Sequence, residues 1–191
     1  GNDAVRTPYV GEGSSNILLE SCSNVSFDSC SIHNNLADNA TLVGGAAFLV
    51  ACDYIYFNDT NVYNISGEGI HSRSNNVKVK GGRFYTSSSS LIGSQRYGTA
   101  GATESKGLVV IGATLADSSG SAISCNSSDS VIEGNYIFDA EIGIILGHRS
   151  SYERRSPADR TVCRGNVITR MNKSGVQHQN GWDCVIDGNT L

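Results

Sequence analysis

The stretch SVIEGNYIFD at residues 130–139 recurs in outline 31 residues later as TVCRGNVITR at residues 161–170. Each stretch contains a frame of three residues at relative positions 1, 3 and 8, most of them apolar, and a Gly-Asn pair at positions 5 and 6. Because strand side chains alternate between two faces, the first two frame residues point to the same side. This period-2 pattern, closed by a turn signal, predicts short β-strands and not helices.

The same frame occurs seven times along the chain. Its first positions are separated by 30, 22, 31, 22, 31 and 23 residues. A repeat of this length predicts a solenoid, in which residues at equal offsets in successive coils stack about 4.8 Å apart. The seven frames consist of Val25, Phe27 and Ile32; Ile55, Phe57 and Val62; Val77, Val79 and Phe84; Leu108, Val110 and Leu115; Ser130, Ile132 and Ile137; Thr161, Cys163 and Ile168; and Cys184, Ile186 and Leu191.

Two further features of each repeat predict how a coil closes. An apolar anchor follows the last frame residue by about eight positions, so each coil has at least three apolar walls. Glycine and asparagine, which tolerate positive φ, stand at the turn after the apolar pair. Asn135, Asn166 and Asn189 share one offset there, so their amides are expected to hydrogen-bond up a column. The anchors are Ile70, Ile92, Ile123, Ile145 and Val176.

With these frames, turns and anchors, residues 17–191 resemble the right-handed parallel β-helix superfamily, the pectate-lyase-like fold of polysaccharide lyases and many phage tailspikes. The resemblance implies an all-β solenoid of about seven coils, with loop insertions at one corner. We expect residues 1–191 to form a single β-helix domain with an irregular N-terminal segment at residues 1–16. Leu191 completes a frame, so the chain is expected to be a piece of a longer protein.

Composition argues against several classes of partner and site. The formal net charge is −4 and no basic block is present, which argues against nucleic acid. No apolar run is long enough to span a membrane, and the first residues lack the pattern of a signal peptide. The six cysteines contain no Cys-x-x-Cys pair, so they do not predict a metal site. Cys22 and Cys52 fall in one column, where either a disulfide or two buried thiols fits the spacing.

Two insertions carry residues suited to ligand binding. The spacing is 16 residues from Ile92 to Leu108 and again from Ile145 to Thr161, where short coils have 7 or 8. Both insertions are therefore expected to leave the same corner, two coils apart. Sugars stack on aromatic faces and guanidinium groups bind carboxylates, so these residue types favour a glycan ligand. The candidate binding residues in the insertions are Gln95, Arg96, Tyr97, Tyr152 and Arg154.

The short coils add polar side chains to the same corner. In the β-helix polysaccharide lyases that the chain resembles, basic residues neutralise a uronate carboxylate, and an Arg, Lys, His or Tyr removes the adjacent proton. The resemblance implies Arg73, His148 and Arg149 as catalytic candidates. The alternative interpretation is a pair of solvated loops with ordinary surface charges. The column three residues after the anchor consists of Arg73, Gln95, Asn126, His148 and Gln179, with His71 and Gln177 two residues earlier on the same side.

A second column lies two residues past the frame. Asp117 and Asp139 occupy it in adjacent coils, so their Cα atoms are expected about 4.8 Å apart. Repulsion raises one pKa of such a pair, which could share a proton, serve as the carboxylates of a retaining glycosidase, or hold Ca²⁺ together with Glu141. The alternative is a turn in which Arg170 and solvent absorb the charge. No cofactor is required by any of these readings. The column consists of Asn34, Asn64, Thr86, Asp117, Asp139 and Arg170.

These features predict a carbohydrate-active β-helix, tailspike-like or lyase-like, that binds an acidic polysaccharide and, as an enzyme, depolymerises it. The residues leave open a polysaccharide lyase or a glycoside hydrolase. The alternatives are a glycan-binding module without turnover and a structural β-helix of a viral tail or surface appendage. The expected partner is a polysaccharide or cell-surface glycan, the expected location is extracellular or on a virion surface, and a homotrimer is one assembly to test. The best candidate contact patch is a strip of outward valines, Val109, Val131, Val162 and Val185.

Overall fold

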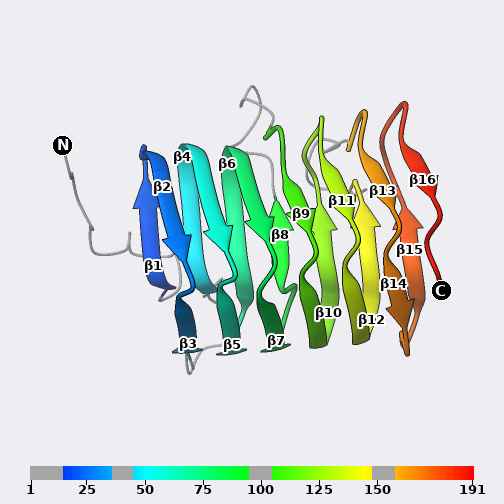
Figure 1. Cartoon of the computed structure of the whole chain (residues 1–191), viewed down its shortest axis with the longest axis horizontal. Coiled ribbons are helices and arrows are strands. Elements are labelled where there is room, and N and C mark those ends of the chain that lie inside the picture. Colours follow the sequence, from blue (N-terminus) through cyan, green and yellow to red (C-terminus); the bar gives the residue numbers. More distant parts are fainter. Residues whose placement is uncertain (1–14, 36–44, 95–104, 148–157) are drawn as a thin grey trace.

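The computed structural model describes residues 15–35, 45–94, 105–147 and 158–191 of the chain. Within these ranges it contains strands and turns and no helix, so none that is long and apolar enough to cross a membrane. Figure 1 shows the strands side by side along the longest axis, from β1 at the N-terminal end to β16 at the C-terminal end. Every strand pairing among the described residues is parallel. The all-β solenoid expected from the repeat is confirmed.

Three faces surround the core, because the strand segments of successive coils pair in three rows. Face A consists of β2 (Ser23–Asp28), the second halves of β4 (Gly45–Asn58) and β6 (Glu68–Lys80), β9 (Val109–Ile111), β11 (Val131–Glu133), β13 (Val162–Arg164) and β16 (Val185–Asp187). Face B consists of β3 (Ser31–Asn35), β5 (Asn61–Ile65), β7 (Arg83–Ser87), the first halves of β10 (Thr114–Cys125) and β12 (Tyr136–Leu146), and β14 (Val167–Thr169). Face C consists of β1 (Ser15–Glu20), the first halves of β4 and β6, β8 (Ile92–Ser94), the second halves of β10 and β12, and β15 (Ser174–His178).

The frame residues are lateral neighbours, as the repeat predicts. Val25 pairs with Ile55, and Ile55 pairs with Val77 in the next coil. Farther along face A, Val110 pairs with Ile132 in the same way. These frame residues point inward, and those of the central coils are almost completely buried. Equal sequence offsets therefore correspond to columns in the structure along faces A and B.

The anchor of one coil was assigned one residue too late. Ile144, and not Ile145, pairs with Ile123 on one side and Val176 on the other. Ile144 is fully buried, whereas Ile145 faces outward and is partly exposed. The cause is a register shift between Ser118 and Ser121, because the corner of β12 is one residue shorter than that of β10. A count of eight residues from the frame fails at this coil.

Each corner carries a column of residues with a left-handed backbone, and some corners hold a second such residue, as at Ser21 and Ala51. Non-glycine residues adopt positive φ uncommonly, and Asn and Asp do so most readily, so two columns are rich in them. The corner from face C to face A uses Asn24, Tyr54, Asn76, Gly107, Asp129, Arg160 and Asp183. The corner from face A to face B uses Ser29, Asp59, Gly81, Gly112, Gly134, Gly165 and Gly188. The corner from face B to face C uses Asn34, Asn64, Thr86, Asp117, Asp139 and Arg170, with φ between 54° and 60°.

The predicted asparagine ladder is present beside the corner from face A to face B. The Asn135 side-chain amide donates to Asn166 Oδ1 over 2.9 Å, and the Asn166 amide donates to Asn189 Oδ1 over 2.8 Å. Each of these oxygens also accepts the backbone N–H of the previous asparagine. Asn135 and Asn166 are about 1% exposed or less, so the ladder satisfies polar groups that no water reaches.

All six cysteines are free thiols, so no disulfide joins Cys22 and Cys52; Cys52 is buried as the second interpretation expected, whereas Cys22 is partly exposed. Cys52, Cys125 and Cys163 are buried and pack with the apolar core. Burial raises the pKa of the Cys163 thiol to about 11, so this sulfur is protonated and unreactive at neutral pH.

Candidate functional site

A groove of about 780 Å³ lies along the corner between face B and face C. Its lining comes from successive coils, so it extends along the solenoid axis. The residues of the left-handed column at this corner, called the corner column below, contribute to it: Asn34, Asn64, Thr86, Asp117, Asp139 and Arg170. Residues of the following turn contribute as well: Ser66, Ser88, Ser119 and Asn172. Buried residues lie at its base: Ile65, Ser87 and Ser118. We call this feature the corner groove.

The buried serines of the corner groove fix the turns that surround it. The Ser87 hydroxyl donates to the Gly67 carbonyl oxygen, and the Ser118 hydroxyl donates to the Ser89 carbonyl oxygen, each acceptor lying in the previous coil. Ser90 and Ser121 share a hydroxyl–hydroxyl hydrogen bond of 3.1 Å inside the corner. These bonds hold neighbouring coils in register, so the polar groups of the groove are positioned before any ligand binds.

Neighbours in the corner column bind each other through their side chains. The Asn64 amide donates to Asn34 Oδ1 over 3.3 Å, and the Thr86 hydroxyl donates to Asp117 Oδ2 over 2.8 Å. Arg170 donates twice to Asp139, from Nε to Oδ1 over 2.7 Å and from Nη2 to Oδ2 over 2.8 Å. The column thus changes from amides at its N-terminal end to charged groups at its C-terminal end.

The two aspartates predicted as a pair have different surroundings. They occupy equivalent positions in β10 and β12, because the residues on either side of them pair. Hydrogen bonding from Arg170 lowers the pKa of Asp139 below its ordinary value. The expected rise in pKa is therefore not found at Asp139, and the alternative in which Arg170 absorbs its charge describes this residue. Asp117 keeps one carboxylate oxygen, Oδ1, without a hydrogen bond to the described residues.

The described residues contain no group of three His, Cys, Asp or Glu side chains placed to hold a metal ion. Both oxygens of Asp139 accept hydrogen bonds from Arg170. Glu141, expected to join a Ca²⁺ site, forms an ion pair with Lys173. The donor set of the corner groove therefore fits hydroxyl-bearing ligands better than a bound cation.

A row of aromatic rings on the outer side of face B was missed by the sequence reasoning. His33, Tyr63 and Tyr85 directly precede Asn34, Asn64 and Thr86 of the corner column. The His33 and Tyr63 rings stack with centroids 4.6 Å apart, and the Tyr63 and Tyr85 rings stack at 5.1 Å. The signal was present in the sequence, because the three residues share one offset from the frame. The same row continues through Ala116 to Phe138, whose ring lies 5.1 Å from Arg170 Cζ.

The outer side of face C holds two of the predicted residues, Arg73 and His71. The Arg73 guanidinium lies 5.3 Å from the centroid of the Phe48 ring, and the His71 ring lies 4.7 Å from that ring. His71 Nδ1 is 2.6 Å from Glu68 Oε2, an ion-pair contact without hydrogen-bond alignment. His71 is only 1% exposed, so its imidazole is not open to a polymer in this structure.

The remaining described residues of this column lie near the corner from face C to face A. The Asn126 amide donates to Ser124 Oγ, and the Gln179 amide donates to Gln177 Oε1. Because of the register shift in β12, Gly147 stands level with Asn126, and His148 comes one residue later. The other candidate residues lie outside the described residues: Gln95, Arg96, Tyr97, His148, Arg149, Tyr152 and Arg154.

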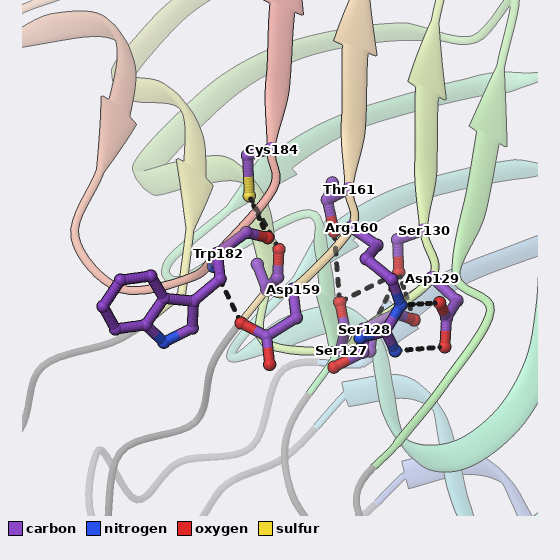
Figure 2. A network of polar contacts seen from close by, with 10 residues as sticks. Ser127, Ser128, Asp129, Ser130, Asp159, Arg160, Thr161, Trp182 and Cys184 are labelled. Carbon is purple, nitrogen blue, oxygen red and sulfur yellow. Dashed lines mark hydrogen bonds and ion pairs between the residues drawn. The ribbon is translucent and has the colours of Figure 1, made fainter.

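The segments of both long insertions join face C to face A, as the spacing predicted, because β8 and β12 precede them on face C and β9 and β13 follow on face A. Arg160, at the end of the second insertion, binds Asp129 through Nε over 2.6 Å and Nη2 over 2.9 Å. Figure 2 shows this pair, with the indole ring of Trp182 pointing away from it and the Trp182 backbone N–H donating to Asp159. Arg160 therefore links two coils through its ion pair with Asp129.

The comparisons with known proteins agree with this geometry. A family model described as a right-handed β-helix region matches residues 15–191. The A-module of the mannuronan C-5 epimerase AlgE6 from Azotobacter vinelandii has a similar structure, with a TM-score of 0.62, 15% identity, and coverage of 93% of this chain and 55% of that one. The AlgE4 A-module of the same organism has a TM-score of 0.56, 11% identity, and coverage of 91% and 55%. The chain thus spans about half the length of these structures, and identities this low show the fold alone. No curated protein is similar enough in sequence to count as a relative.

Proposed function

The chain belongs to the family of right-handed β-helix proteins, and we propose that it binds a polysaccharide lengthwise in the corner groove. The observation that carries this proposal is the groove itself, which is lined by amide, hydroxyl and charged side chains from successive coils. The coils repeat about every 4.8 Å along the axis, so hydrogen-bonding groups recur along the groove at this spacing. A polymer of sugar units, which also repeats its hydroxyl groups along one direction, matches this arrangement.

The chemistry of the lining supports a carbohydrate over other long ligands. Amides and hydroxyls donate and accept hydrogen bonds in the way that sugar hydroxyls require. The net charge of the chain is −4, which disfavours nucleic acid as the polymer. The two structural neighbours are named as epimerases of mannuronan, so mannuronan is a reasonable first polymer to test.

A second candidate function, chemical modification of a uronate polymer, is favoured by the cluster on face C. Arg73 stands over the Phe48 ring, the His71 ring contacts that same ring, and His71 is paired with Glu68, so a cation and two groups able to exchange protons belong to one cluster. A guanidinium neutralises a uronate carboxylate, and this makes the proton next to that carboxylate easier to remove. Exposure of His71 to substrate is a requirement of this candidate function, since the imidazole is buried in the present structure.

Incubation of the protein with uronate polymers separates these functions. Absorbance from unsaturated sugar ends identifies a lyase, and new reducing ends without that absorbance identify a hydrolase. A changed ratio of the two C-5 epimers, read by NMR, identifies an epimerase. Binding on a glycan array without any of these products leaves the groove as a non-catalytic binding site. Absence of binding to every polymer contradicts the proposal and favours a structural role.

A structural role requires a surface through which copies of the solenoid contact each other. We propose an extracellular or virion-surface setting, in which the outward valines of face A are the contact between copies. Val109, Val131 and Val162 are partly exposed and lie in one column, as the sequence predicted. Sedimentation analysis tests this arrangement, because a trimer that disperses on Val131→Lys supports it and a monomeric wild-type protein excludes it.

A further inference from the structure

The aromatic row of face B is interrupted at one coil. Tyr85 pairs with Ala116, and Ala116 pairs with Phe138 in the next coil. One side of the Tyr85 ring stacks on Tyr63, so its other side faces the place above Ala116. Among the described residues, the register places the methyl group of Ala116 alone between the Tyr85 and Phe138 rings. We call this place the Ala116 gap.

The gap has the width of a bound ring. Two strand spacings separate Tyr85 from Phe138, which is about 9.5 Å. A ring between two others needs a carbon–carbon separation of about 3.5–4.0 Å on each side, or about 7–8 Å in all. An aromatic side chain at position 116 would instead continue the row at the 4.6–5.1 Å spacing seen between His33, Tyr63 and Tyr85. Ala116 is 8% exposed, so only a small part of its surface is open to solvent at the base of this row.

The carboxylate of Asp117 belongs to the residue that follows Ala116. The backbone φ of Asp117, 55°, places this residue in the corner column. Its Oδ2 accepts the Thr86 hydroxyl, and its Oδ1 makes no hydrogen bond to the described residues. Arg170 is bound to Asp139 through two hydrogen bonds and does not neutralise Asp117. A sugar hydroxyl can donate to Oδ1, whereas a uronate carboxylate at that position would be repelled.

We propose that the Ala116 gap is a subsite for one neutral pyranose ring, which lies between the Tyr85 and Phe138 rings and donates a hydroxyl to Asp117. This inference rests on the proposed function and adds the class of sugar that the corner groove selects at this coil. Apolar faces of pyranose rings pack on aromatic rings, and the two rings supply such a surface on both sides. The subsite also accounts for the interruption of the aromatic row at this coil.

Filling the gap tests the subsite without removing any contact. Ala116→Tyr continues the stack from Tyr85 to Phe138, so we expect an unchanged or raised melting temperature. Binding of a short neutral β-glucan oligosaccharide should weaken roughly tenfold or more, which corresponds to about 1.4 kcal/mol or more. The matched control is Ile111→Tyr, which adds the same ring to an outward position of a central strand on face A, outside the valine strip, and should leave binding unchanged.

Two further variants keep the test decisive where Ala116→Tyr does not fold. Tyr85→Ala removes one wall of the gap, and Asp117→Asn removes the charged acceptor, so both should weaken the neutral oligosaccharide severalfold. Wild-type affinity in the variants that fold overturns the subsite, as does tighter binding of a mannuronate oligosaccharide than of the neutral one at low salt. A wild-type protein that binds no glycan contradicts the proposed function itself, and this outcome is distinct from glycan binding that ignores position 116.

Discussion

Arg170 and Asp139 face each other across two neighbouring coils, with Nε 2.7 Å from Oδ1 and Nη2 2.8 Å from Oδ2. The pair lies at the charged end of the corner groove, and both carboxylate oxygens of Asp139 accept hydrogen bonds from Arg170. Both side chains are about half exposed, so the bond contributes more to the arrangement of the groove than to the stability of the fold.

Arg170→Gln tests this relationship. Loss of the guanidinium removes the hydrogen bonds that lower the pKa of Asp139, so we expect that pKa to rise toward its ordinary value of 3.8. The melting temperature should change little, because the pair is solvent-exposed. NMR titration of the Asp139 carboxyl carbon measures the shift. An unchanged pKa would show that another group holds this carboxylate.

Acid should destabilise the protein slightly through its solvent-exposed, ion-paired aspartates. Arg160 and Arg170 lower the pKa values of Asp129 and Asp139 below 3.8 in the folded state. A carboxylate with a lowered folded-state pKa adds stability above its unfolded pKa and loses it as the pH falls through the folded value. We therefore expect the unfolding free energy to fall as the pH drops below about 4. In thermal melts across this range, an Asp129→Asn/Asp139→Asn double variant should show a shallower loss, and an identical pH profile would contradict the assignment.

The buried asparagine ladder should dominate the stability of the C-terminal coils. Asn166→Ala removes an amide that binds Asn135, Asn189 and the Ile132 carbonyl oxygen of the previous coil. Because the groups left behind are buried, the expected cost is about 3 kcal/mol in urea unfolding. Asn58→Ala is the matched control, since Asn58 binds Asp28 at a partly exposed position and should cost far less. Equal losses of unfolding free energy in the two variants would show that the ladder stabilises the fold no more than an exposed hydrogen bond does.

Arg73 should affect uronate recognition and not the corner groove. Arg73→Ala removes the guanidinium over Phe48, so we expect weaker binding of a mannuronate oligosaccharide at low salt and a smaller salt dependence. Arg149→Ala, in the second insertion, is expected from the sequence to have the same effect without a change in thermal stability. Calorimetry measures the affinity of each variant for the mannuronate oligosaccharide. Uronate binding that survives both substitutions would remove face C and the insertion from the site.

The sequence predicted those parts of the molecule that follow from equal offsets. Frame residues such as Ile55 and Val77 stack because strands in successive coils pair in register, and the ladder through Asn166 follows from the same rule. The prediction failed at Ile145, where one corner is a residue shorter and shifts the anchor to Ile144. A residue count cannot detect this, since Ile144 and Ile145 are equally apolar.

Side-chain pairing was harder to predict than position. The sequence placed Asp117 and Asp139 in one column, but only the structure shows that the side chains of Thr86 and Arg170 divide them into two different environments. The stacked row through Tyr63 could have been predicted, because its members share one offset from the frame. Burial of His71 depends on tertiary packing and could not be read from its outward offset.

Polysaccharide binding in the corner groove is tested most directly by calorimetric titration of a groove-filling variant against the wild-type protein. Ser119 lines the groove and is exposed, so Ser119→Trp places a large ring in the path of the polymer, and Ser23→Trp does the same on face A as a control. We predict that wild-type protein and Ser23→Trp bind oligosaccharides with an affinity that rises with chain length, and that Ser119→Trp loses this binding while melting normally. Binding by Ser119→Trp that equals the wild type, or no glycan binding by the wild type, would contradict the account.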